Sequence, residues 1–139
     1  MKSCDLTLVN KFDYAGIEGG LEAPALPILI FRKGMKSSAK TLALVDTGLD
    51  EGLLVSRDVR DIVFAESGPP DTHESLWAGV VQIPCEVYLV SVKALDKWVS
   101  VKSYAPIYDG YETLIGRLLL NTLNLCLRGS MKRLYIATE

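Results

Sequence analysis

The 139-residue sequence has little of several features that commonly mark a function. It holds one histidine, His73, and three widely separated cysteines with no C-x-x-C pair. This number and spacing indicate neither a zinc site nor a disulfide framework. A Ser-His-Asp triad built on His73 would lack visible supporting residues. We therefore expect no metal and no cofactor.

An excess of charge and a long apolar run are also missing. Fifteen basic residues against seventeen acidic ones give a formal net charge of −2, which is not the basic footprint of a nucleic-acid-binding protein. No apolar run approaches the ~20 residues of a membrane helix. The first residues, Met1 to Leu6, lack the apolar core of a signal peptide. These absences predict a cytoplasmic protein without a nucleic-acid or membrane partner.

What the sequence does contain is a series of short β-like runs between Gly- and Pro-containing turns. A hydrophobic fraction of 49% supports one core, so we expect a single domain over residues 1–139, with 1–25 as an N-terminal extension of uncertain role. Two short helices are expected, Arg57 to Glu66 after the N-cap Ser56 and Arg117 to Leu123. The pattern predicts a mostly β barrel or sandwich. The expected strands are Leu6–Val9, Pro27–Phe31, Thr41–Val45, Leu53–Val55, Thr72–Trp77, Val80–Val92, Trp98–Tyr104, Leu125–Arg128 and Arg133–Ala137.

One tripeptide, Asp46-Thr47-Gly48, stands directly after the run Thr41–Val45, which is apolar enough to be buried on both faces. Taken alone, such a tripeptide is also an ordinary turn, since Asp and Gly are turn formers. Its context favours more than a turn. Further along the chain, Leu114-Ile115-Gly116 places an apolar pair and a glycine before the second expected helix.

From about Leu26 to the C-terminus, these features resemble the retroviral-type (retropepsin-like) aspartic proteases and their cellular and prokaryotic relatives. The resemblance rests on the apolar strand into Asp46-Thr47-Gly48, on the hairpin around Trp77-Ala78-Gly79 with Ala78-Gly79 as its expected tip, and on Leu114-Ile115-Gly116. It implies a mostly β, closed barrel of the retropepsin-like acid protease type with a flap hairpin. The flap would close over a bound peptide and exclude water.

The resemblance also implies an aspartic endopeptidase mechanism. Two carboxylates held about 3 Å apart share one proton, so that one takes a proton from water and the other polarises the substrate carbonyl. Because the sequence carries one such motif, the second aspartate would come from a second copy, as an Asp46/Asp46′ dyad at a homodimer axis. Thr47 is suited to hold the loop, and Gly48 lets a substrate backbone approach. In the retroviral enzymes an aspartate placed like Asp50 pairs with an arginine placed like Arg117.

Several alternatives stay open at this point. The same fold could serve as a non-catalytic dimeric peptide-binding or dimerisation module. Trp77 could cover substrate or pack on the barrel, and the loop from Ile107 to Tyr111 could line substrate pockets or pack as an ordinary loop. Retroviral dimers weave their chain ends into a shared sheet. The terminal strand, Leu134 to Thr138, could do this or could close its own barrel.

Overall fold

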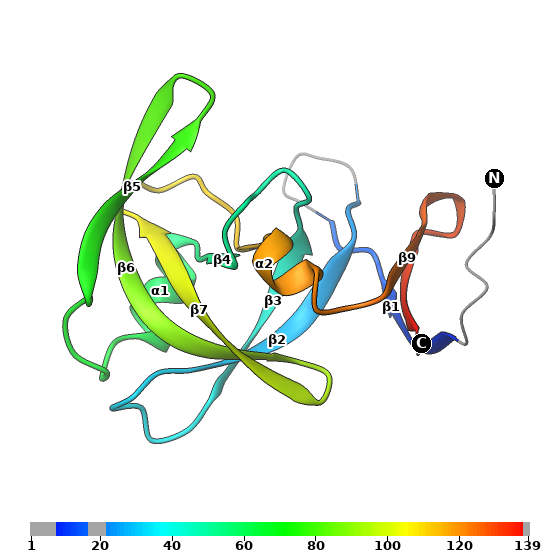
Figure 1. Cartoon of the computed structure of the whole chain (residues 1–139), viewed down its shortest axis with the longest axis horizontal. Coiled ribbons are helices and arrows are strands. Elements are labelled where there is room, and N and C mark those ends of the chain that lie inside the picture. The colour runs from blue at the N-terminus through cyan, green and yellow to red at the C-terminus, as the bar shows by residue number, and fades with distance from the viewer. Residues whose placement is uncertain (1–7, 17–21, 138–139) are drawn as a thin grey trace.

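The computed structural model describes residues 8–16 and 22–137, which form a β-barrel, a separate small sheet and two short α-helices (Figure 1). A 3₁₀-helix, η1, lies between the last two strands. The elements in chain order are β1 (Leu8–Asp13), β2 (Ala25–Phe31), β3 (Ala39–Val45), β4 (Leu53–Leu54), α1 (Arg57–Val63), β5 (Thr72–Ala78), β6 (Val81–Ala94), β7 (Lys97–Pro106), β8 (Leu114–Ile115), α2 (Arg117–Leu120), β9 (Leu125–Arg128), η1 (Gly129–Met131) and β10 (Arg133–Ala137).

Seven strands form one sheet in the order β2-β3-β8-β4-β7-β6-β5, and an additional pairing between β2 and β6 closes six of them into a barrel, with β5 added to the edge of β6. Most neighbours are antiparallel, but β3 pairs in parallel with β8, and β4 pairs in parallel with β7. The expected mostly β, closed barrel is therefore confirmed. The parallel pairing of β3 with β8 brings the end of β3, where Asp46 follows, beside the segment that contains Gly116.

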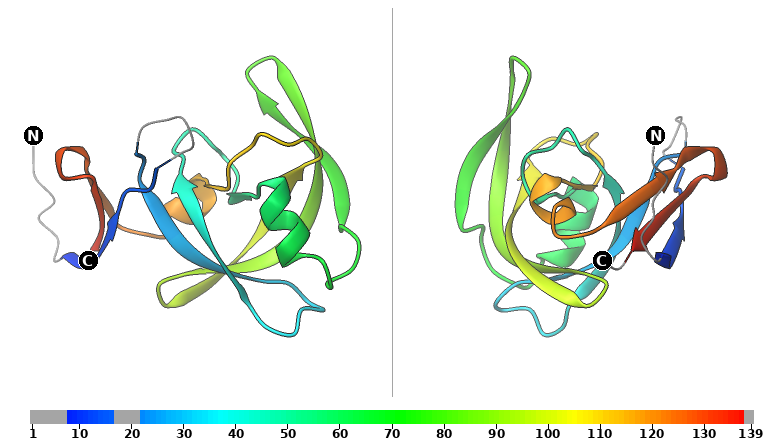
Figure 2. Two further views of the ribbon diagram at one scale, coloured as in Figure 1. Left: turned by 180° about the vertical axis from the view of Figure 1, so that it is seen from behind. Right: turned by 45° about the vertical axis from the view of Figure 1, so that its right-hand side comes forward.

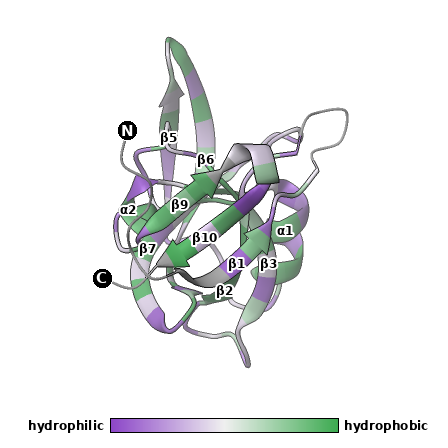
Figure 3. Cartoon of the chain, turned by 90° about the vertical axis from the view of Figure 1, so that its right-hand side faces the viewer, coloured by the Kyte–Doolittle hydropathy of each residue, from purple (hydrophilic) through white to green (hydrophobic). Residues whose placement is uncertain are grey.

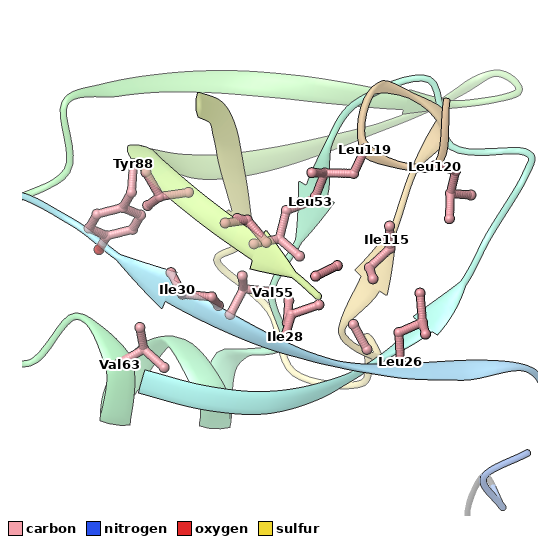
Figure 4. Packing of buried hydrophobic residues seen from close by; sticks show 14 of the residues in the cluster. Leu26, Ile28, Ile30, Leu53, Val55, Val63, Tyr88, Ile115, Leu119 and Leu120 are labelled. Atoms are coloured by element: carbon pink, nitrogen blue, oxygen red, sulfur yellow. The ribbon is translucent and has the colours of Figure 1, made fainter. Parts of the chain in front are cut away.

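The barrel interior is filled by aliphatic side chains from opposite walls (Figure 4). Ile30, Leu53, Val55 and Ile115 are each 0% exposed. Burying such a side chain contributes roughly 1.5–3 kcal/mol. The core therefore fixes the strands that carry both motifs.

Several boundaries differ from the sequence expectation. Helix α1 starts at Arg57 and is N-capped by Ser56, as expected, but it ends at Val63 instead of Glu66. Helix α2 ends at Leu120 instead of Leu123. The prediction that the run Thr41–Val45 is buried on both faces is wrong, because Leu42 is 52% exposed. Within this strand only one face lies against the barrel core, and Ala43 provides its fully buried contact.

Arg32 lies where the edge of β6 changes its partner strand from β5 to β2. The β5 ladder ends at Thr72, opposite Val87, whereas β2 joins β6 only at Phe31. Arg32 is 8% exposed, and it donates to Ser67, Gly68 and Pro69 and to the Asp71 carboxylate. That carboxylate also accepts the Leu89 N–H at 2.7 Å. The buried guanidinium therefore fixes the loop that the Gly-Pro-Pro segment begins.

The second sheet, which we call the terminal sheet, consists of β1, β10 and β9 in that order and lies to one side of the barrel (Figures 1 and 2). Strand β10 pairs antiparallel with both β1 and β9. The C-terminal strand therefore does not close the barrel. The first expected strand, Leu6–Val9, begins outside the described residues, and its described part belongs to β1. Thr138 also lies outside them.

Candidate active site

Asp46 is the first residue after β3, at the mouth of the loop that leads to β4. Its N–H donates to the Ile115 carbonyl at 2.9 Å, and its own carbonyl accepts from Leu49 at 3.3 Å. Oδ1 of the carboxylate accepts the Gly48 N–H at 2.9 Å. Asp46 is half-buried, and within the described chain this is the only hydrogen bond of its side chain. Its other carboxylate oxygen is therefore free to face a second group.

Thr47 and Gly48 are both exposed. The Thr47 hydroxyl makes no hydrogen bond within the described part of this chain, so it does not hold the loop from inside the monomer. The carboxylate leaves little room for a side chain at Gly48, because a Cβ there would lie 3.2 Å from Asp46 Oδ1. The motif thus presents a carboxylate and a hydroxyl at the surface of a tight turn.

The backbone around Gly116 packs against the loop that follows Asp46 and fixes it by hydrogen bonds. Its N–H donates to the Gly52 carbonyl at 3.0 Å, and the next N–H, of Arg117, donates to the Leu49 carbonyl at 2.8 Å. A Cβ at Gly116 would lie 2.0 Å from the Glu51 carbonyl oxygen. The glycine is therefore required because the second motif packs directly on the backbone of the first.

Leu114 and Ile115 supply the rest of this support. They form β8, whose residues pair with Leu44 and Val45 at the end of β3. Ile115 is 0% exposed and sits in the barrel core (Figure 4). The structure thus brings together the two sequence motifs.

Asp50 and Arg117 form an ion pair across the same contact. Their side chains are 78% and 52% exposed, so the pair stabilises the fold by at most about 1 kcal/mol. The pair orients the loop after Asp46 relative to the start of α2, because it joins the two segments.

The sequence reasoning missed Thr113, which is 5% exposed just before β8. Its Oγ1 accepts the Ser56 N–H at 3.0 Å and lies 3.2 Å from Ser56 Oγ. Its carbonyl accepts the Leu44 N–H at 2.9 Å. Thr113 therefore links β3 to the N-cap of α1. The available signal was a polar residue placed directly before an apolar strand.

The hairpin of β5 and β6 projects away from the barrel (Figures 1 and 2). Its two-residue tip is Gly79-Val80, because Ala78 is the last residue of β5 and pairs with Val81. The expected tip, Ala78-Gly79, is therefore wrong by one residue. Gly79 has φ +64°, a left-handed conformation that glycine adopts without strain. Trp77 is 68% exposed and lies on the hairpin without packing into the core.

The base of this hairpin holds a second apolar cluster around Ile83, Cys85 and Tyr104. Burial, together with the negative charges of Glu51 and Glu74, raises the pKa of Tyr104 to about 12. The phenol is therefore neutral at physiological pH. Tyr111 packs against the cluster.

The loop from 107 to 110 is exposed and shows its apolar and aromatic side chains to solvent. Tyr108 is 60% exposed, and Arg57 donates to the Ile107 carbonyl at 3.1 Å. A hollow of about 590 Å³ opens elsewhere, over β6 and β7, and none of the motif residues lines it. The carboxylate of Asp46 therefore lies outside that hollow.

The described residues contain no group of three or more His, Cys, Asp or Glu side chains that could hold a metal ion. They also contain no helix with the length and apolar character needed to cross a membrane. The chemistry available at the site is that of an aspartate carboxylate.

The same fold occurs in two solved aspartic proteases. EIAV protease, in complex with the inhibitor HBY-793, matches with a TM-score of 0.54 and 14% identity, over 72% of this chain and 86% of its own. A retropepsin-like aspartic protease from Rickettsia conorii matches with a TM-score of 0.57 and 16% identity, over 91% of this chain and 98% of its own. No family model and no curated protein sequence matches. The chain therefore has the retropepsin-like aspartic protease fold.

Proposed function

We propose that this chain is an aspartic endopeptidase of the retropepsin-like family, related to its cellular and prokaryotic branch, and that it acts as a homodimer. The observation that carries the proposal is the position of Asp46. Its loop is fixed by Gly116 and by backbone hydrogen bonds, while the Thr47 hydroxyl and one oxygen of the Asp46 carboxylate make no hydrogen bond within the described part of the chain. The fold that the chain shares with two aspartic proteases supports the same reading.

The reaction follows from the chemistry of two close carboxylates. In the homodimer the two Asp46 side chains share one proton, since both cannot ionise at about 3 Å. The ionised member removes a proton from a water molecule, which attacks the peptide carbonyl. The protonated member donates a hydrogen bond to the carbonyl oxygen. The pair titrates as a unit, so its pKa values belong to both residues together.

The β5–β6 hairpin is proposed as the flap that covers an extended peptide. Trp77 and Val80 are 68% and 94% exposed at its end and offer apolar surface for a peptide to cover. A substrate strand beneath them would cover apolar surface and add backbone hydrogen bonds. The exposed loop from 107 to 110 is proposed as a neighbouring pocket wall. A cytoplasmic location and the absence of a nucleic-acid partner remain predictions from the sequence.

The test is cleavage of a peptide library from about pH 3 to pH 8, because a shared-proton pair gives a pH-dependent rate. Wild type, Asp46→Asn and a matched control, Asp96→Asn on the exposed β6–β7 turn, are assayed at a concentration at which the wild type is shown to dimerise. We expect cleavage by wild type and control, inhibition by a pepstatin-like compound, and no cleavage by Asp46→Asn.

Other outcomes would reject the proposal. Equal cleavage by wild type and Asp46→Asn would mean that the activity does not come from this residue. A confirmed dimer that cleaves nothing at any pH would favour the non-catalytic peptide-binding or dimerisation module instead.

A further inference from the structure

The hollow of about 590 Å³ lies on the outer face of the barrel wall that β2, β6 and β7 form. Leu89 and Ser91 of β6 share this face, because side chains two positions apart along a strand point the same way. On β7, Lys102 lies opposite Leu89, and Ser100 lies opposite Ser91. Phe31 of β2 lies opposite Ser91 on the other side. All five residues line the hollow, so its floor is one continuous face of three strands.

Part of this face is apolar and open to solvent. Leu89 is 56% exposed and Phe31 is 38% exposed, whereas the next residue along β6, Val90, is buried in the core. A ligand that covers the two exposed side chains removes apolar surface from water, which favours binding. Because exposed apolar residues are common on protein surfaces, the polar groups around them decide which ligand fits.

The polar side chains of the hollow are lysines and serines, and none of the described residues that line it is an aspartate or glutamate. Lys33, Ser91 and Ser100 make no side-chain hydrogen bond or ion pair with any residue in the described part of the chain. Lys102 Nζ lies 3.2 Å from Glu74 Oε1, and an ammonium group has three N–H donors, so it can bind a further acceptor. The hollow therefore offers donors and positive charge to a ligand that carries carboxylates.

Positive charge prevails on this face, although the whole chain has a formal net charge of −2. Lys93 continues the face along β6. Two carboxylates bond to residues of the face, and both are already paired, since Asp71 lies against Arg32 and Glu74 against Lys102. A net negative chain does not attract long phosphate polymers or anionic bilayers from a distance. A short acidic stretch of polypeptide needs only the local match of charge.

One residue connects the hollow to the support of the candidate active site. Val101 of β7 lines the hollow and also packs against the barrel core. A Cβ at Gly52 would lie 2.7 Å from the Cβ of Val101, and Gly52 accepts the Gly116 N–H at 3.0 Å. A polypeptide in the hollow would therefore lie beside this support and leave Asp46 open to another part of the same polypeptide.

The terminal sheet contributes nothing to the hollow. Figure 3 shows β1, β9 and β10 at one end of the barrel. Every residue that lines the hollow belongs to β6, to β7 or to the segment from Phe31 to Lys33. The hollow is therefore complete within one copy of the chain, and binding to it can be measured without knowing how two copies meet.

We propose that the hollow is an exosite for the polypeptide substrate, which binds an acidic segment of that substrate outside the peptide bond that is cleaved. Apolar side chains of the segment cover Phe31 and Leu89, and its carboxylates bind Lys33 and Lys102. The proposal rests on the proposed function, since it names a substrate class for the same enzyme. An enzyme of this kind cleaves substrates that carry an acidic and apolar segment in preference to others.

The first experiment measures binding by fluorescence anisotropy, with the fluorescein-labelled peptide Glu-Glu-Leu-Phe-Glu-Glu as the probe. The protein is the full chain with Asp46→Asn, so that cleavage cannot remove the probe. Lys33→Glu in this background is compared with Lys36→Glu. Lys36 is exposed in the same connection between β2 and β3 and does not line the hollow, so it is the control for an equal change of charge.

We expect Lys33→Glu to weaken binding about tenfold, because a repulsion replaces an attraction to the glutamates, and Lys36→Glu to change it less than about twofold. Both lysines are exposed, so both variants should keep the wild-type circular dichroism spectrum. Equal affinities of all three proteins for the probe would overturn the proposal. A single-stranded oligothymidylate that binds through Lys33 while the acidic peptide does not bind would overturn it in favour of a nucleic-acid site.

A second experiment tests the selectivity of cleavage. Two substrates share one cleavage sequence taken from the peptide library, and one also carries Glu-Glu-Leu-Phe-Glu-Glu behind a flexible Gly-Ser linker of about 20 residues, which spans roughly 25 Å. Binding away from the reacting bond is equal in the ground and transition states, so it lowers KM and leaves kcat unchanged. We expect the extension to lower KM severalfold for the wild type and to have no effect for Lys33→Glu.

The two experiments together separate this inference from the proposed function. If cleavage depends on Asp46 but neither the affinity for the probe nor KM depends on Lys33, the exosite is wrong and the protease remains. If the probe binds through Lys33 and no peptide is cleaved at any pH, the hollow is supported as an acidic-peptide site and the protease is rejected.

Discussion

Replacing Gly116 by alanine tests the central contact of the site, the packing of the second motif on the first. The added Cβ would lie 2.0 Å from the Glu51 carbonyl oxygen and 2.8 Å from both the Leu49 carbonyl oxygen and Leu49 Cγ. Real Cβ atoms essentially never approach another heavy atom closer than 3.0 Å. The backbone must therefore separate by about 1 Å or more, because the nearest atom belongs to the main chain and has no rotamer to escape into.

This separation breaks or weakens two hydrogen bonds, from Gly116 to Gly52 and from Arg117 to Leu49. Each contributes about 1 kcal/mol, and forcing an extra methyl group into packed structure costs typically ~1–3 kcal/mol. We expect Gly116→Ala to lower the free energy of unfolding by about 3–5 kcal/mol, which corresponds to a fall in Tm of roughly 10–15 °C for a chain of this size.

The measurement is urea denaturation followed by circular dichroism, with Gly16→Ala as the matched control. A Cβ at Gly16 would meet nothing within 4 Å, so the control should stay within about 0.5 kcal/mol of the wild type. A loss below about 1 kcal/mol for Gly116→Ala would show that the two motifs do not pack as described.

Three further substitutions test other parts of the fold. Arg32→Lys should cost about 2–3 kcal/mol in urea denaturation, because one ammonium group cannot replace a guanidinium that bonds four residues; an unchanged midpoint would contradict the role given to this residue. The Leu89 N–H, together with Arg32, lowers the pKa of Asp71 in the folded protein. The ionised Asp71 therefore stabilises the fold at pH values above its unfolded pKa of about 4. This stabilisation is lost as the pH falls through the lower pKa of the folded state. Asp71→Asn should therefore be less stable at neutral pH and should lose less stability on acidification, and parallel urea curves for the two proteins at all pH values would refute this. The Ser103 hydroxyl is buried and has no hydrogen-bond partner among the residues that the structure describes, so Ser103→Ala should leave the free energy of unfolding equal or raise it by up to about 1 kcal/mol; a clear loss would mean that the hydroxyl has a partner.

The sequence predicted correctly those features that depend on residues close together in the chain. Ser56 caps α1 because its Oγ accepts from Val59, three residues on. The last two strands, Leu125–Arg128 and Arg133–Ala137, have the expected bounds, since the turn between them is marked by Gly129-Ser130. The tip of the β5–β6 hairpin shifted by one residue because the register depends on pairing along the whole ladder.

The exposure of β3 shows a different limit. The run Thr41–Val45 is apolar from Leu42 onward, yet Leu42 is half-exposed. Composition indicates that a strand is apolar, but what covers each face depends on elements far away in the chain. Arg32 shows the converse case, since an arginine in the sequence gave no sign that its guanidinium would be buried among carbonyls of residues 67–69.

The sequence by itself pointed to the residues that we propose carry the chemistry. It marked Asp46-Thr47-Gly48, it marked Leu114-Ile115-Gly116, and it suggested that Asp50 and Arg117 would meet. Only the tertiary structure decided how these segments touch, because the parallel pairing of β3 with β8 joins residues about seventy positions apart. It also decided that β10 is paired on both sides within its own chain. Strand partners are chosen by long-range packing, and no local pattern in the chain encodes that choice.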